Sequence, residues 1–211
     1  MKISKIYGLA GIIGLILAWA SISTAIIVSN CFNIVSMALS DLGDWTTACG
    51  SSTICLDSCN RLSETIFNYG LIVSGILIAF ASLGLYKYSK SYPLLLTLSG
   101  ISLSLIGVLP ERYGKIHFLA ALFFFLLLPI AMLLYAKSTW NTNRKESLTT
   151  IILSIISFSG ILLFITIKTI KLNLGYAIPE IIGALPATTW LEIIFLEHLV
   201  GENNQPNGNE T

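Results

Sequence analysis

The sequence predicts an all-α, polytopic membrane protein built as a bundle of six transmembrane helices. Of its 211 residues, 55% are hydrophobic and only 11% are charged, whereas a soluble domain has roughly 25% charged residues. The apolar residues also form six runs that are long enough, or nearly so, to cross a hydrocarbon core of about 30 Å. Backbone groups in lipid must be satisfied within their own segment, so each run is predicted to be a helix.

The six predicted helices form one membrane domain over residues 1–200. They cover Ile6–Val28, Ile66–Tyr86, Pro93–Leu109, Ile116–Ala136, Leu148–Ile167 and Ile178–Val200. The Ala18-Trp19-Ala20 pattern in the first run is typical of a signal peptidase site, but the run continues to Val28, which favours an uncleaved span. The polar tail Gly201–Thr211 is expected to be disordered.

The basic residues predict the orientation, because cytoplasmic loops carry an excess of Lys and Arg. With a cytoplasmic N-terminus, the inner side holds Lys2, Lys5, Lys87, Lys90, Lys137, Arg144 and Lys145. The outer side then holds Arg61, Arg112, Lys115, Lys168 and Lys171. This excess predicts a multi-pass protein of the cell membrane with both termini in the cytoplasm.

All four cysteines fall in the long connection at residues 30–63, after the first run. They are Cys31, Cys49, Cys55 and Cys59. An even number of cysteines in one polar segment predicts two disulfides of undetermined connectivity, which persist outside the cytosol and agree with an outer loop. The alternative is a four-thiolate zinc site, although the paired C-x2-C spacing typical of such sites is missing.

With this topology, polar side chains from separate segments reach one membrane level, the outer interface. The candidate catalytic or ligand-binding residues are Asp41, Glu111, His117 and Glu180, and the candidate supporting residues are Asn68, Arg112 and Lys115. Carboxylates and imidazoles of this kind bind divalent metals or act as acid–base partners, here toward a lipid headgroup. The spacing establishes neither role and identifies no metal or cofactor.

Glu180, Glu111 and His117 also have simpler structural explanations. Glu180 follows Pro179, and an acid in the first turn of a helix favours the helix dipole. Glu111 would be a solvated carboxylate paired with Arg112 or Lys115, and His117 a hydrogen-bonded but inert imidazole.

Three functional hypotheses follow. The first is a non-catalytic membrane subunit or partner-binding protein whose disulfide-braced loop contacts other membrane subunits. The second is an outer-leaflet enzyme, or a metal- or headgroup-binding site, that uses the four candidate residues. The third is a small-solute or proton-coupled transporter in which Glu192 faces the bundle interior or is protonated. The sequence has no HExxH, GxSxG, P-loop or dinucleotide motif, and its net charge of +1 does not favour a nucleic-acid partner.

Four segments carry a resemblance to a known family. They are "ALSDLG" (Ala38–Gly43), "FNYGLIVSGIL" (Phe67–Leu77), "GVLPERYGKIH" (Gly107–His117) and "AIPEIIGALPATTW" (Ala177–Trp190). In this order the chain resembles the small archaeal and bacterial integral membrane proteins known as domain of unknown function 998. The resemblance implies a six-helix bundle in the lipid bilayer and no particular activity.

The orientation can be tested by labelling engineered cysteines in intact cells with an impermeant maleimide. A cysteine next to Arg112 should react from outside, and one next to Lys145 should react only after permeabilisation. The reverse pattern would contradict the predicted orientation.

Overall fold

The computed structural model describes residues 3–29, 31–44, 46, 57–172 and 174–200, and in these ranges the protein is helical without strands. The long helices are α1 (Ile3–Val28), α3 (Asp57–Leu83), α4 (Ser91–Val108), α5 (Lys115–Thr139), α6 (Arg144–Ile170) and α7 (Ala177–Val200). Short 3-10 segments are η1 (Leu39–Gly43), η2 (Gly84–Lys87) and η3 (Glu111–Tyr113). The all-α six-helix prediction is therefore confirmed.

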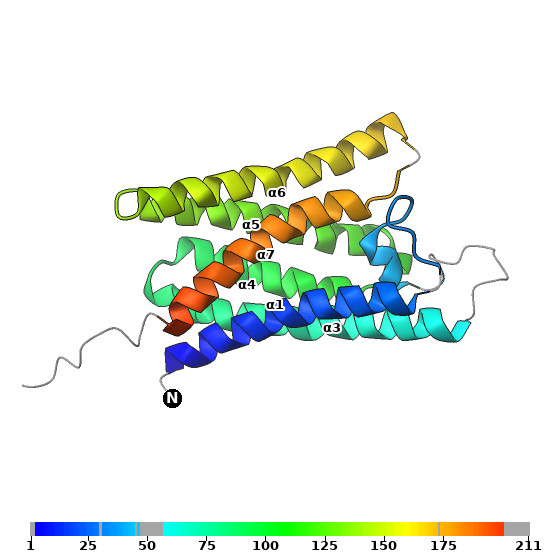
Figure 1. Cartoon of the computed structure of the whole chain (residues 1–211), viewed down its shortest axis with the longest axis horizontal. Coiled ribbons are helices and arrows are strands. Elements are labelled where there is room, and N and C mark those ends of the chain that lie inside the picture. The colour runs from blue at the N-terminus through cyan, green and yellow to red at the C-terminus, as the bar shows by residue number, and fades with distance from the viewer. Residues whose placement is uncertain (1–2, 30, 45, 47–56, 173, 201–211) are drawn as a thin grey trace, which may run out of the picture.

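The long helices form a closed ring and run alternately up and down the bundle (Figure 1). Each helix packs against the next one in the chain, and α7 packs back against α1. Leu96, Leu128, Met132 and Phe195 are fully buried inside the ring. The start of α1 and the last turn of α7 lie at the same end of the bundle, which we call the terminal end. The opposite end, the loop end, holds η1, η3 and the α6–α7 connection.

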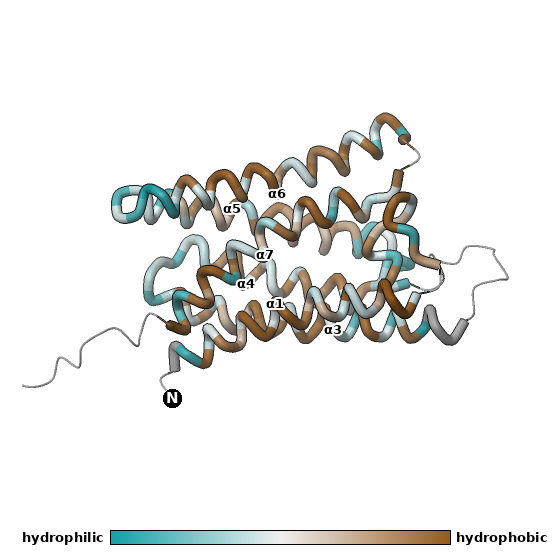
Figure 2. Tube along the Cα trace, viewed as in Figure 1, coloured by the Kyte–Doolittle hydropathy of each residue, from teal (hydrophilic) through white to brown (hydrophobic). Residues whose placement is uncertain are grey.

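All six long helices have the length and composition of membrane spans. The shortest, α4, has 18 residues, or about 27 Å at 1.5 Å per residue, close to the thickness of a hydrocarbon core. Figure 2 shows hydrophobic residues along the helices and hydrophilic ones gathered near the two ends. Exposed apolar side chains such as Ile16, Ile155 and Leu162 cover the sides of the bundle. This distribution defines a multi-pass membrane protein.

Two sequence expectations differ from the structure. Helix α3 begins at Asp57 rather than at Ile66, because its first turns are polar and extend past the apolar run. Glu192 is exposed on α7, so the expectation that it faces the bundle interior is wrong. Its protonation stays a prediction.

The long connection is described only in part. Cys49 and Cys55 lie outside the described residues, as does the side chain of Cys59. The predicted disulfides, and the polar tail Gly201–Thr211, therefore fall outside what the structure describes.

Glycine sets the close approach of α3 and α4. A Cβ atom at Gly100 would lie 2.6 Å from the backbone nitrogen of Ala79 and 2.7 Å from the carbonyl oxygen of Gly75. Both are backbone atoms, so a larger residue would push the two helices apart. A hydrogen bond also joins the two helices, because the Ser104 hydroxyl donates to the carbonyl oxygen of Ile72 at 2.9 Å. Small residues at such contacts are a general device of membrane helix packing.

A Gly100→Val variant is expected to unfold at a lower temperature, because overpacking costs about 1–3 kcal/mol and shifts the midpoint by roughly 2–12 °C. Thermal unfolding of the purified protein in detergent measures this. Ile101→Val is the matched control, since Ile101 is 47% exposed on the same helix. Equal midpoints for the two variants would contradict the assigned contact.

Candidate functional site

The segment that precedes η1 is held against the start of α7 by backbone hydrogen bonds. Gly175 N–H donates to the Val35 carbonyl at 2.7 Å, and Ala177 N–H donates to the Met37 carbonyl at 2.9 Å. A Cβ atom at Gly175 would overlap the Met37 backbone, so glycine is required for this approach. The pairing brings η1 over the loop end of the bundle, directly above Glu180.

Two carboxylates fix the backbone of η1. Glu180, in the first turn of α7, accepts the backbone N–H of Leu39 at 2.6 Å and also that of Ser40. Asp41 accepts the N–H of Ala38 at 2.8 Å and so caps the 3-10 turn. The donors are N–H groups at the start of a turn, which favour negative charge. Glu180 therefore joins α7 to η1 by hydrogen bonds, in addition to being an acid in the first turn of a helix.

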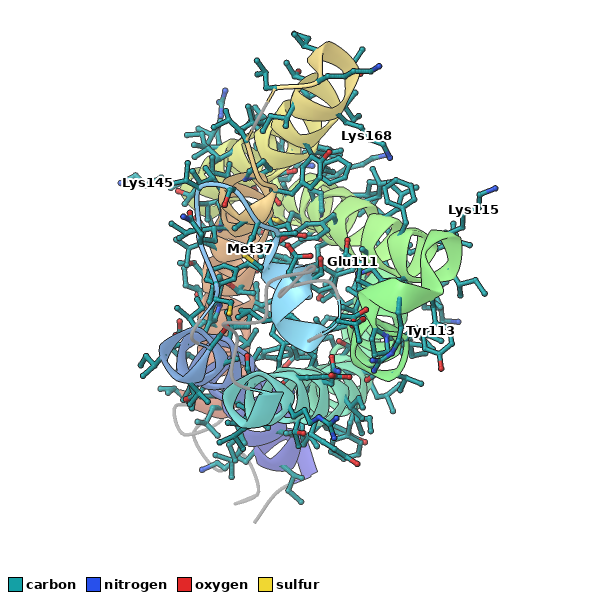
Figure 3. The ribbon with its side chains drawn as sticks, turned by 90° about the vertical axis from the view of Figure 1, so that its right-hand side faces the viewer. Met37, Glu111, Tyr113, Lys115, Lys145 and Lys168 are labelled. Carbon is teal, nitrogen blue, oxygen red and sulfur yellow. The ribbon has the colours of Figure 1, made fainter. Side chains whose placement is uncertain are left out.

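Glu111 completes a group of three carboxyl side chains. It lies between η1 and α5 at the centre of the loop end (Figure 3), where it accepts the Ser40 hydroxyl at 3.3 Å and hydrogen-bonds to Asp41. Burial, the hydrogen bond to Asp41 and the charges of Asp41 and Glu180 together raise the pKa of Glu111 to about 8. A hydrogen bond between two carboxyl groups needs a shared proton, which Glu111 can hold at neutral pH. The expected pairing of Glu111 with Arg112 or Lys115 is wrong.

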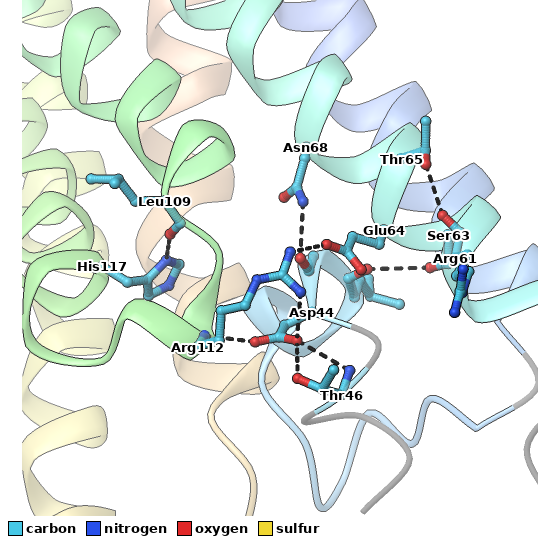
Figure 4. A network of polar contacts seen from close by, with 12 residues as sticks. Asp44, Thr46, Arg61, Ser63, Glu64, Thr65, Asn68, Leu109, Arg112 and His117 are labelled. Atoms are coloured by element: carbon cyan, nitrogen blue, oxygen red, sulfur yellow. Dashed lines mark hydrogen bonds and ion pairs between the residues drawn. The ribbon is translucent and has the colours of Figure 1, made fainter. Parts of the chain in front are cut away.

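His117 is buried in the first turn of α5, with 6% of its surface exposed. Its Nδ1 lies 2.6 Å from the carbonyl oxygen of Leu109 (Figure 4). A carbonyl can only accept, so Nδ1 carries a proton, and in the neutral tautomer with this proton Nε2 is a hydrogen-bond acceptor. Among the described residues Nε2 has no hydrogen-bond partner. The Leu109 carbonyl thus holds the imidazole in one orientation.

A cavity of about 540 Å³ lies beside this group, between α5, α6 and α7. Its polar end is formed by Ser40, Glu111, His117 and Glu180. Its walls are largely apolar and include Phe118, Leu122, Phe125, Ile161, Phe164 and Ile165. Lys115 and Lys168 also line it. A smaller cavity of about 80 Å³ inside the bundle shares Ser40, His117 and Glu180 with the first.

A second polar network lies on the other side of η1 (Figure 4). Asp44 is fully buried and accepts the backbone N–H of Arg112 at 2.6 Å. The Arg112 guanidinium pairs with Asp44 and with Glu64 on α3. Asn68 donates to the carbonyl oxygen of Gly43 at 2.9 Å. These contacts join η1, η3 and α3 without reaching the cavity.

The structure brings together most of the candidate residues. Glu111, His117 and Glu180 line the cavity, as does Lys115. Asp41 contacts Glu111 but does not line the cavity, and Arg112 and Asn68 belong to the second network. No three His, Cys, Asp or Glu side chains among the described residues are placed to hold a metal ion, so a metal centre has no support there.

Four residues that sequence reasoning did not single out take part in these contacts. Ser40 donates to Glu111, Lys168 lines the cavity, and Asp44 and Glu64 bind Arg112. Ser40 had a signal in the sequence, because it stands next to Asp41 in the "ALSDLG" segment. The other three had none, because their partners come from distant parts of the chain.

The fold and the site define a six-helix integral membrane protein with a laterally placed cavity that ends in carboxyl and imidazole groups. The chain belongs to the family described as "Protein of unknown function (DUF998)", whose model matches residues 12–197. No curated protein and no solved structure matches the chain. The family resemblance stated from the four segments is therefore confirmed.

The raised pKa of Glu111 predicts a pH-dependent stability. In the unfolded chain its carboxyl titrates near 4.5 and in the folded protein near 8. The folded state binds the extra proton between these values, so this group's contribution to stability is fully present below pH 4.5 and is lost as the pH rises to about 8. Glu111→Gln should make the thermal midpoint less dependent on pH between 5 and 8 than in the wild type. Parallel profiles would contradict the assignment.

Proposed function

We propose that this protein binds a lipid-like amphiphile at its loop end, with the headgroup at the polar end of the cavity and an alkyl chain along the apolar walls. One observation carries the proposal. A single cavity joins the group of Ser40, Glu111, His117 and Glu180 to a wall of aromatic and aliphatic side chains. Its volume of about 540 Å³ falls in the range of roughly 300–1,000 Å³ that is usual for small-molecule sites.

The position of the cavity favours a ligand that arrives from the membrane. Phe118 and Ile165 line it and are 41% and 52% exposed on the sides of α5 and α6. In a membrane these surfaces face lipid tails, so an alkyl chain can occupy the cavity without leaving an apolar environment. The polar end lies at the loop end, where the Val108–Lys115 connection leaves the span. A molecule with one polar and one apolar part matches both surroundings.

The other two hypotheses have less support from the geometry. The hypothesis of a partner-binding subunit depends on the cysteine-containing loop, of which residues 30, 45 and 47–56 lie outside the described residues. The transporter hypothesis depends on Glu192, which is exposed on α7 and does not line either cavity. The headgroup-binding alternative uses residues that share one cavity, so we prefer it. With the predicted topology, the site would serve the outer leaflet.

Filling the cavity tests the proposal. Ile161 lines the cavity on α6, whereas its neighbour Leu162 is 64% exposed and does not. The purified protein is mixed with a phospholipid that carries a photoactivatable acyl chain, irradiated and digested, and the labelled peptides are quantified by mass spectrometry. Wild type should be labelled on α5 and α6, and Ile161→Trp should reduce this labelling about tenfold, the equivalent of roughly 1.4 kcal/mol.

Leu162→Trp is the matched control, since it adds the same side chain to the same helix on the lipid-facing side. It should leave the labelling of α5 and α6 unchanged. Equal labelling in the two variants would show that the lipid contacts only the outside of the bundle, and would refute the proposed site.

A further inference from the structure

Cationic side chains lie at one edge of the cavity. Lys168, on α6, has its ammonium 4.7 Å from the ring centre of Phe118 and 5.9 Å from that of Phe164. Contacts between a cation and an aromatic face are attractive and hold the ammonium in place. Figure 3 shows Lys168 and Lys115 directed toward the same side of the loop end. Both side chains are exposed, and neither forms an ion pair with a described carboxylate, so this edge presents positive charge to a ligand.

Two other side chains that line the cavity offer hydrogen-bond acceptors. In its neutral form His117 has a lone pair on Nε2, and this atom has no partner among the described residues although the side chain is almost completely buried. Glu180 uses its carboxylate to accept two backbone N–H groups and still lines the cavity. A ligand group with N–H or O–H bonds could donate to this nitrogen and to the carboxyl group of Glu180.

We propose that the headgroup is a phosphodiester that ends in a hydrogen-bond donor, as in phosphatidylethanolamine or phosphatidylglycerol. The phosphate would lie at the edge with Lys168 and Lys115, and the terminal ammonium or hydroxyl would reach His117 Nε2 and Glu180. This inference rests on the proposed function, and it adds the chemical class of the ligand. The two kinds of group that line the cavity, the lysine ammonium groups and the hydrogen-bond acceptors, match the phosphate and the donor of such headgroups.

Choline headgroups keep the phosphate and the positive charge but have no N–H bond. Phosphatidylcholine therefore cannot donate to His117 Nε2 or Glu180, and we expect it to bind roughly tenfold more weakly than phosphatidylethanolamine. Diacylglycerol lacks the phosphate and should lose the contacts at the lysine edge. Phosphatidylcholine therefore tests the contacts at His117 and Glu180, and diacylglycerol tests the contacts at the two lysines.

The test uses the full-length protein in detergent and a fluorescent phosphatidylethanolamine. Its displacement is measured with phosphatidylethanolamine, its N-methyl and N,N-dimethyl forms, phosphatidylcholine, phosphatidylglycerol, diacylglycerol and soluble glycerophosphoethanolamine. Affinity should fall along the methylation series, with the largest loss when the last N–H is removed. Phosphatidylglycerol should bind about as well as phosphatidylethanolamine. Glycerophosphoethanolamine should displace the probe only at far higher concentration.

Two variants assign the residues. Glu180→Gln keeps an acceptor for the Leu39 N–H but replaces the carboxylate, and it should remove the preference for phosphatidylethanolamine over phosphatidylcholine. Lys168→Gln should weaken all phospholipids about equally and leave diacylglycerol unchanged. Lys171→Gln is the control for lost charge, because Lys171 is exposed and does not line the cavity. Lys168 is also exposed, so its variant is expected to fold even if Glu180→Gln does not.

The outcomes separate the two proposals. Equal affinity for phosphatidylethanolamine and phosphatidylcholine, or an effect of Lys171→Gln as large as that of Lys168→Gln, overturns the headgroup assignment while lipid binding stands. Displacement by glycerophosphoethanolamine at the same concentration as the lipid overturns a membrane source for the ligand. If the fluorescent lipid binds the wild type and Ile161→Trp equally, the proposed function itself is refuted.

Discussion

The hydrogen bond from the Leu39 N–H to the Glu180 carboxylate is the constraint on which the loop end depends. It joins the first turn of α7 to a segment 141 positions earlier in the chain and places η1 as a cover over the bundle. Asp41 and Ser40 then meet Glu111, and the polar end of the cavity is assembled from three separate segments. The donors to Glu180 are backbone N–H groups. The connection between α7 and η1 therefore depends on the path of the main chain and not on a cationic side chain.

The loop end keeps its charges in two groups of different kinds. Arg112 forms ion pairs with Asp44 and Glu64 on one side of η1. On the other side, Asp41, Glu111 and Glu180 share a small space, and no described cation forms an ion pair with them. Repulsion and burial then favour the protonated form of Glu111. The first group is suited to hold segments together, and the second is suited to exchange hydrogen bonds with a ligand.

Sequence reasoning predicted the helices well and the contacts between them only in part. Apolar runs indicated all six spans, because the membrane requires about 20 apolar residues in each. The polar first turns of α3 were missed for the same reason, since hydropathy detects the part of a helix that lies in lipid. Alternation of the spans was enough to place Asp41, Glu111, His117 and Glu180 at one level. It could not distinguish which acid Arg112 binds, because side-chain partners depend on the rotation of each helix and the path of η1.

The placement of α6 has a consequence for how a ligand enters. This helix packs chiefly against α5 and α7, and Figure 1 shows it diverging from the other helices toward the loop end. Near its middle it is fastened by Gly160, where a Cβ atom would lie 2.5 Å from Gly183 N, and by Ser157, which donates to the Gly183 carbonyl. Beyond that point its cavity-facing side is an outer wall of the bundle. A pivot of this last portion would widen the opening while the packing of the other five helices stayed as it is.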